Sequence, residues 1–174
     1  SLKHGEPTSL SQVGLFVDGC AVKRIGEETF KISQKYVDDV ILVSIDETCA
    51  AIKDIYEDTR VMSEPAGALA VAGMKKYILN NNLENKKIIA INSGANLNFD
   101  RLRHVTERAE IGEGKELLLS VKIPEKSGSF RAFCEVIGRK SISEFNYRYS
   151  NENSANVFVG IKTDNIEKDT KNLF

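Results

Sequence analysis

A serine followed by a glycine stands at the end of a buried apolar segment, where it could contact a small-molecule ligand. The apolar run at 87–92 is typical of a strand covered on both faces, and Ser93 and Gly94 follow it directly. In open α/β sheets, ligands bind at the carboxyl ends of the strands. A hydroxyl beside small residues lets a flat ring approach the backbone, although an ordinary strand-to-helix turn explains the same residues equally well.

Other segments could also line a site, and each has a plain structural explanation. Glu64 opens a helix, where the helix dipole favours an acidic residue, and positions 18–19 form a turn. The Gly112–Lys115 segment suggests a phosphate-binding loop. That interpretation fails because the phosphate-loop motif needs a glycine where Ala109 stands, and Ser or Thr where Glu116 stands. We interpret this segment as a linker.

Composition argues against several classes of protein. Among 174 residues, 24 basic and 25 acidic side chains give a net charge of −1, so no charge excess points to a nucleic acid or an anionic membrane. The apolar runs fall far short of the roughly 20 residues needed to span a bilayer. The N-terminus has no signal-peptide core.

Cysteine and histidine usage indicates a reducing compartment and no metal site. Cys20, Cys49 and Cys134 are widely spaced and odd in number, and they form neither a disulfide framework nor a Cys-x-x-Cys pair. The two histidines do not lie at ligand spacing. We therefore expect a cytoplasmic protein without a bound metal.

Residues 1–110 alternate helix and buried-strand patterns, which predicts an α/β layer with a mostly parallel sheet. Helices are expected from near Glu27, after a cap at Asp46, and from Ala66 to about Asn80. Strands are expected at 40–43 and 87–92. Because two strands are too few for an independent doubly wound sheet, we expect a partial layer.

The pattern changes in residues 111–174. Alternating apolar positions predict strands at 117–123, 145–149 and 155–161, with one helix after the first strand and another capped by Asp164. This β-α-β-β-α order is typical of an α+β ferredoxin-like unit that lacks its last strand. One edge of its sheet is then expected to be unpaired.

Several segments together resemble one enzyme family. Residues 13–30, 64–77 and 93–99 are similar, in that order, to biosynthetic threonine dehydratase, also called threonine ammonia-lyase. Residues 123–130 and 143–148 look like the start of that enzyme's regulatory domain. The resemblance covers essentially the whole chain.

The resemblance implies a pyridoxal 5'-phosphate enzyme of the tryptophan-synthase-β-like class. Such an enzyme converts L-threonine to 2-oxobutanoate and ammonia in isoleucine biosynthesis, forms a tetramer when intact, and carries an ACT-like domain that senses isoleucine and valine. The family's serine-glycine turn implies that Ser93 hydrogen-bonds the cofactor's pyridine nitrogen with Gly94 beside it, while Gly19 and Glu64 line the pocket. A neutral hydroxyl leaves the ring a weaker electron sink than a carboxylate would, which favours prompt β-elimination.

The chain departs from the family in two ways. Ala66 stands where many members have serine, so a hydrogen bond from that hydroxyl is absent. The family's Schiff-base lysine motif and glycine-rich phosphate loop are also missing, so we assign no catalytic residue. We therefore expect residues 1–110 to be the C-terminal portion of a catalytic domain and 111–174 an incomplete ACT-like regulatory domain, inactive by themselves.

The turn at 124–130 is the expected effector site. Backbone N–H groups near Gly128 suit a carboxylate, Glu125 could receive an ammonium group, and Phe130 could meet a branched side chain. The plain alternative is that Gly128 only eases a turn, Glu125 is solvated and Phe130 belongs to the core.

Functions other than threonine dehydration are also compatible with parts of the sequence. A non-catalytic amino-acid-sensing module would use residues 111–174 for binding. An RNA-binding ferredoxin-like domain is disfavoured, because Phe145, Tyr147 and Tyr149 lack the aromatic-basic pattern of such domains. A related serine or threonine lyase is the alternative within the enzyme class, and the 124–130 segment argues against it.

Overall fold

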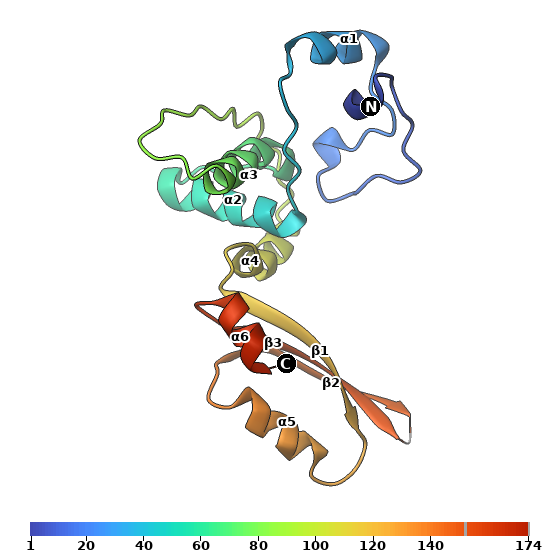
Figure 1. The fold of residues 1–174 in the computed structure, drawn as a ribbon, viewed down its shortest axis with the longest axis vertical. Helices are drawn as coiled ribbons and strands as arrows, with labels where there is room; N and C mark the ends of the chain where they lie inside the picture. The colour runs from blue at the N-terminus through green and yellow to red at the C-terminus, as the bar shows by residue number, and fades with distance from the viewer. Residues whose placement is uncertain (152, 174) are drawn as a thin grey trace. The chain divides into compact units, whose positions relative to one another are not determined.

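The computed structural model describes residues 1–151 and 153–173, and the chain divides into two compact units (Figure 1). The units are Ser1–Ala109, which is helical, and Glu110–Phe174, which contains a three-stranded sheet. Within the described ranges, none of the helices has the length and apolar character needed to cross a membrane.

The first unit consists of helices joined by long connections. They are α1 (Glu27–Tyr36), α2 (Ile45–Thr59), α3 (Pro65–Asn80) and α4 (Arg101–Gly112), preceded by the 3-10 turns η1 (Leu2–His4) and η2 (Asp18–Cys20). Small buried residues such as Ala51, Ala68 and Ala72 let α2 and α3 pack closely. The predicted helices from Glu27 and over 66–80 are confirmed, whereas α4 was not predicted because its core face includes only Val105 and Ala109.

The N-terminal cap of α2 differs from the prediction. Ser44, not Asp46, caps the helix, because the capping residue must directly precede the first helical turn. The Ser44 Oγ accepts from the Glu47 N–H at 3.0 Å, and the Glu47 Oε2 accepts from the Ser44 N–H at 2.6 Å. Burial opposes ionisation of the Glu47 carboxyl, but hydrogen bonds from Ser44 and Lys76 outweigh it, so the pKa of Glu47 is lowered.

The strands predicted at 40–43 and 87–92 are not formed in the structure. No β-ladder joins either segment to another part of the described chain. Most apolar side chains there are exposed, with Leu42 at 76%, Ile89 at 91% and Ile91 at 75%. A strand exists only when a neighbour accepts and donates its ladder hydrogen bonds, so an apolar run alone does not produce one.

The second unit follows the predicted β-α-β-β-α order. Its elements are β1 (Glu116–Pro124), α5 (Ser129–Ile137), β2 (Ile142–Asn151), β3 (Ser154–Lys162) and α6 (Ile166–Leu173). The sheet order is β1-β3-β2 with both pairings antiparallel. The cap predicted at Asp164 lies one residue later, since the Asn165 Oδ1 accepts from the Lys168 N–H at 2.9 Å.

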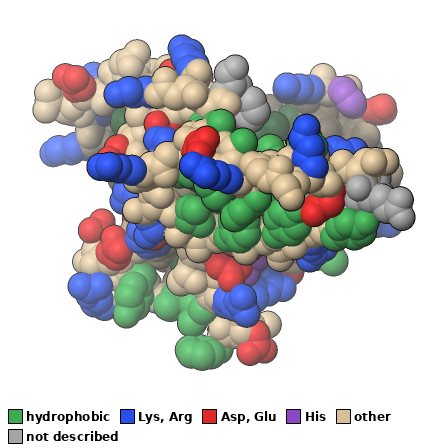
Figure 2. All heavy atoms as spheres, turned by 90° about the horizontal axis from the view of Figure 1, so that it is seen from below, with side chains coloured by type: hydrophobic (Ala, Val, Ile, Leu, Met, Phe, Trp, Pro, Cys, Tyr) green, Lys and Arg blue, Asp and Glu red, His purple; other side chains and the backbone are tan. Residues whose placement is uncertain are grey.

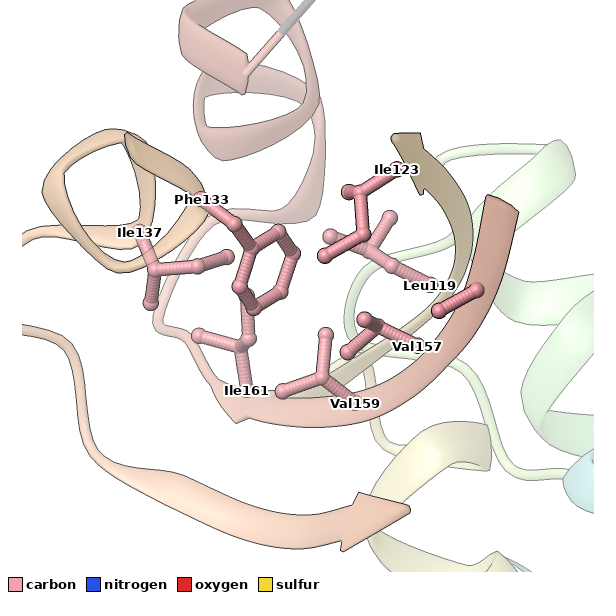
Figure 3. Close-up of a cluster of buried hydrophobic side chains, with 8 residues drawn as sticks. Leu119, Ile123, Phe133, Ile137, Val157, Val159 and Ile161 are labelled. Atoms are coloured by element: carbon pink, nitrogen blue, oxygen red, sulfur yellow. The ribbon is translucent and has the colours of Figure 1, made fainter. Parts of the chain in front are cut away.

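The core of the second unit lies between α5 and one face of the sheet. Figure 3 shows Phe133 and Ile137 of α5 directed toward Val159 and Ile161 of the central strand β3. Residues at alternate positions of β3 point to the core, which is the period that the sequence predicted. Other apolar side chains remain at the surface, and Figure 2 shows such side chains gathered in a band among charged ones.

Candidate functional site

The candidate cofactor site is built at the N-terminus of α3, where the 92–94 segment lies against the helix. The Glu64 N–H donates to the Gly94 carbonyl oxygen at 3.1 Å. Pro65 occupies the first helical position, where its missing N–H costs nothing. The helix start and the predicted serine-glycine turn are therefore joined through the backbone.

Two glycines permit this close approach. A Cβ at position 67 would lie 2.5 Å from the Gly94 oxygen and 2.6 Å from the Asn92 Oδ1. A Cβ at position 94 would overlap the Glu64 Oε1. At position 67 the obstacle includes the Gly94 backbone, so a side chain there would push the segment away from the helix, whereas at position 94 the Glu64 side chain would have to move.

The η2 turn, which precedes α3 in the sequence, also packs against the start of this helix. A Cβ at Gly19 would lie 2.8 Å from the Ala66 Cβ, so this loop packs on the first turn of α3. Arg101 donates to the Phe16 carbonyl oxygen at 2.7 Å and to the Asp18 Oδ2 at 3.1 Å. Arg101, which the sequence analysis missed, therefore ties the loop to the start of α4.

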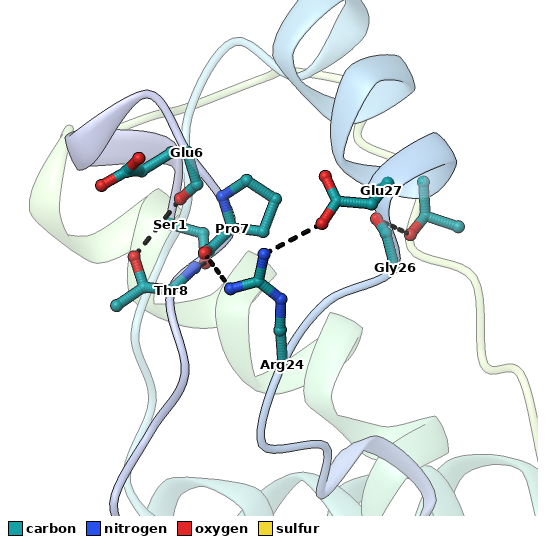
Figure 4. Close-up of polar contacts among 8 residues, drawn as sticks. Ser1, Glu6, Pro7, Thr8, Arg24, Gly26 and Glu27 are labelled. Carbon is teal, nitrogen blue, oxygen red and sulfur yellow. Dashed lines mark hydrogen bonds and ion pairs between the residues drawn. The ribbon is translucent and has the colours of Figure 1, made fainter.

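A second contact holds the segments on either side of this loop. Arg24 donates to the Pro7 carbonyl oxygen at 2.5 Å and to the Glu27 Oε1 at 2.9 Å (Figure 4). The Leu10 N–H also donates to the Lys23 carbonyl oxygen at 2.8 Å. The loop that carries Gly19 is thus held at both of its ends.

The structure brings the predicted cofactor residues to one helix turn. Glu64 and Gly94 are in contact, Gly19 packs on the neighbouring Ala66, and Ser93 is exposed between Asn92 and Gly94. Sequence reasoning missed Ser63, whose hydroxyl is completely buried beneath this turn. The only signal for it was a hydroxyl residue placed directly before Glu64.

The predicted effector turn lies at the start of α5. Gly128 has a φ of 90°, in the left-handed region that glycine adopts without strain, and its carbonyl oxygen accepts from the Ala132 N–H at 3.0 Å. The Glu125 Oε2 accepts from the Tyr147 hydroxyl at 2.5 Å. This hydrogen bond to a carboxylate raises the pKa of Tyr147. Tyr147 of β2 is therefore a further member of this group.

Phe130 joins the same group through its ring. It meets Phe145 and Tyr147 edge-on at centroid distances of 5.6 Å and 5.9 Å, and it stacks on Phe133 at 6.1 Å. The Phe130 side chain nevertheless remains 43% exposed. Phe130 therefore packs on a core residue, Phe133, while part of its ring remains at the surface.

Comparison with known proteins assigns the class. The model of the family described as "Pyridoxal-phosphate dependent enzyme" matches residues 1–94, more than half of the chain, so the chain belongs to this family. A second model, described as "C-terminal regulatory domain of Threonine dehydratase", matches residues 107–173. These matches confirm the predicted α/β class with its ACT-like unit, and they confirm pyridoxal phosphate as the cofactor of the family.

The individual relatives are biosynthetic threonine dehydratases, as the resemblance predicted. The chain is 54% identical over 168 residues to the L-threonine dehydratase biosynthetic IlvA of Haemophilus influenzae, covering 97% of this chain and 33% of that protein. It is 52% identical to the Escherichia coli protein of the same name, covering 93% of this chain and 32% of that protein. The chain thus spans about a third of these relatives' length.

A solved structure is also similar to this chain. The processed form of threonine deaminase isoform 2 from Solanum lycopersicum superposes with a TM-score of 0.62 at 42% sequence identity. The match covers 63% of this chain and 30% of that one.

The groups at the α3 N-terminus are chemically suited to a pyridoxal-phosphate ring. The Ser93 hydroxyl both donates and accepts, so it can pair with a neutral pyridine nitrogen. Gly94 has no side chain of its own, and the Glu64 carboxylate lies directly beside it, so the turn offers a hydroxyl and a carboxylate close together. We therefore consider these residues able to hold one edge of the cofactor.

We predict that Gly67→Ala weakens cofactor binding by the complete protein while Gly73→Ala does not. The added methyl at position 67 meets the Gly94 oxygen, and such overpacking costs about 1–3 kcal/mol. Gly73 lies on the same helix, and a methyl group added there would have nothing within 4 Å, so alanine should stabilise by about 0.4–1 kcal/mol. Urea unfolding and absorbance titration with pyridoxal phosphate measure both effects. Equal behaviour of the two variants would contradict the proposed contact.

Proposed function

We propose that the complete protein is a threonine dehydratase that converts L-threonine to 2-oxobutanoate and ammonia in isoleucine biosynthesis. The observation that carries this proposal is the 54% identity to a biosynthetic threonine dehydratase over 97% of the chain. We further propose that residues 1–110 are the C-terminal portion of the catalytic domain and 111–174 an incomplete ACT-like regulatory domain. The catalytic lysine is assigned to no residue of this chain, which is expected to be inactive alone.

Within the catalytic portion, we assign four residues to the cofactor. When bound, pyridoxal phosphate stabilises negative charge at the substrate's α-carbon. Ser93 hydrogen-bonds the pyridine nitrogen without placing a permanent charge there, Gly94 lies beside the ring, and Gly19 and Glu64 line the pocket. The contact of Gly94 with Glu64 and the packing of Gly19 on Ala66 support this assignment.

The first experiment is to incubate the complete, cofactor-loaded protein with L-threonine and with L-serine. We expect 2-oxobutanoate from threonine, faster than pyruvate from serine, and inhibition by isoleucine. Faster turnover of serine without isoleucine inhibition would favour a related serine lyase. Binding of branched amino acids without any turnover would favour an amino-acid-sensing module.

We also propose that the 124–130 turn binds isoleucine or valine. Gly128 opens α5, so the backbone N–H groups that follow can meet the carboxylate, and Glu125 meets the ammonium group. A cavity of about 220 Å³ next to Phe130, lined also by Ile137, Ile142 and Phe145, offers apolar space for a branched side chain. The Tyr147 hydroxyl holds the Glu125 carboxylate in place at 2.5 Å.

Glu125→Gln and Phe130→Ala should each reduce inhibition by isoleucine in the complete protein. Loss of a charged hydrogen bond costs about 1.5–3 kcal/mol, so the half-inhibitory concentration should rise about 10- to 150-fold for Glu125→Gln. Arg131→Ala is the control, because that side chain is 86% exposed on the same helix. If both variants keep wild-type sensitivity at wild-type catalytic rate, the effector site lies elsewhere.

We propose a cytoplasmic homo-oligomer, a tetramer when intact, on the basis of the family resemblance. Three free cysteines support a reducing compartment. Of these, Cys49 is chemically inert, because burial and then the nearby Asp46 raise the pKa of its thiol to about 11.

A further inference from the structure

The Ser63 hydroxyl is a completely buried donor placed between α3 and the 92–94 segment. Ser63 has no exposed surface. Its Oγ lies 2.7 Å from the Asn92 Oδ1, 3.1 Å from the Glu64 carbonyl oxygen and 3.3 Å from the Gly94 carbonyl oxygen. A hydroxyl has one proton to donate, and the shortest distance assigns it to the Asn92 side chain.

Asn92 is held toward the helix although much of the residue is exposed. Its Oδ1 would lie 2.6 Å from a Cβ at position 67, so the amide occupies space that the absence of a Gly67 side chain provides. One short hydrogen bond and one close packing contact therefore fix the Asn92 side chain. This anchors the residue directly before Ser93.

The residue directly after Ser93 is anchored as well. The Gly94 carbonyl oxygen accepts from the Glu64 N–H at 3.1 Å, and the Gly94 α-carbon packs on the Glu64 carboxylate. Ser93 therefore lies between two fixed neighbours, with its own side chain exposed. The backbone of Ser93 is therefore held on both sides.

We propose that Ser63 and Asn92 are positioning residues that aim the Ser93 hydroxyl at the cofactor's pyridine nitrogen. We call this pair the Ser63–Asn92 clasp. The inference rests on the proposed role of Ser93 in the cofactor site, and it adds the two residues that hold Ser93 in place. Neither residue touches the cofactor in this arrangement.

The test uses the complete protein with Ser63→Ala, Asn92→Ala and the double variant. Each single variant loses one neutral hydrogen bond, so the Kd for pyridoxal phosphate should rise about 3- to 10-fold, in line with the usual contribution of such a bond. The absorption band of the bound cofactor should shift, because the partner of the pyridine nitrogen moves. Because the two residues act as a pair, the double variant should bind no more weakly than the weaker single variant.

Control measurements separate positioning from stability. Ser33→Ala removes an exposed helix hydroxyl that donates to the Thr29 carbonyl oxygen, and it should leave the Kd and the band unchanged. Lower urea midpoints with an unchanged Kd and band in both single variants would overturn the clasp. Asn92→Ala keeps the test decisive if Ser63→Ala does not fold, because Asn92 is exposed.

The readout is independent of the substrate. Wild-type protein that binds the cofactor but does not dehydrate threonine would contradict the proposed function. The Kd and absorption band of the variants would still show whether the Ser63–Asn92 clasp positions Ser93. Wild-type protein that does not bind pyridoxal phosphate would overturn both.

Discussion

The close approach of the 92–94 segment to the first turn of α3 is the constraint on which the candidate site depends. Gly67 makes the approach possible, because a methyl group there would lie 2.5 Å from the Gly94 oxygen. The Glu64 N–H then binds Gly94, and Gly19 reaches the adjacent Ala66 from the η2 turn. Segments far apart in sequence therefore meet at one helix start, where glycines let their backbones approach closely.

The proposed effector site of the second unit is built differently. Its sheet alternates core and surface positions, and β2 contributes Phe145 and Tyr147 to the side on which α5 packs. Tyr147 orders the Glu125 carboxylate, while Phe130 remains partly exposed among the aromatic rings. A carboxylate and an apolar surface thus lie together at a helix start, which is the arrangement that the proposed effector site needs.

Local patterns in the sequence predicted the elements whose stability is local or whose core lies within the chain. The helices at Glu27 and over 66–80 and the β-α-β-β-α order followed from periodicity. The strands at 40–43 and 87–92 did not form, because a ladder partner is a property of another segment and not of the apolar run. The family motifs identified Gly94 and Glu64 as candidate site residues. Ser63, Arg101 and Tyr147 were missed, because their contacts join segments distant in sequence and periodicity does not reveal such contacts.

The most direct test of this account is a crystal structure of the complete protein with pyridoxal phosphate bound. The account predicts that the Ser93 Oγ lies within hydrogen-bond distance of the pyridine nitrogen, about 2.7–3.2 Å. It also predicts that the Ser63 hydroxyl still contacts the Asn92 side chain in that structure. A pyridine nitrogen that meets a carboxylate or another side chain, with Ser93 turned away, would contradict the account.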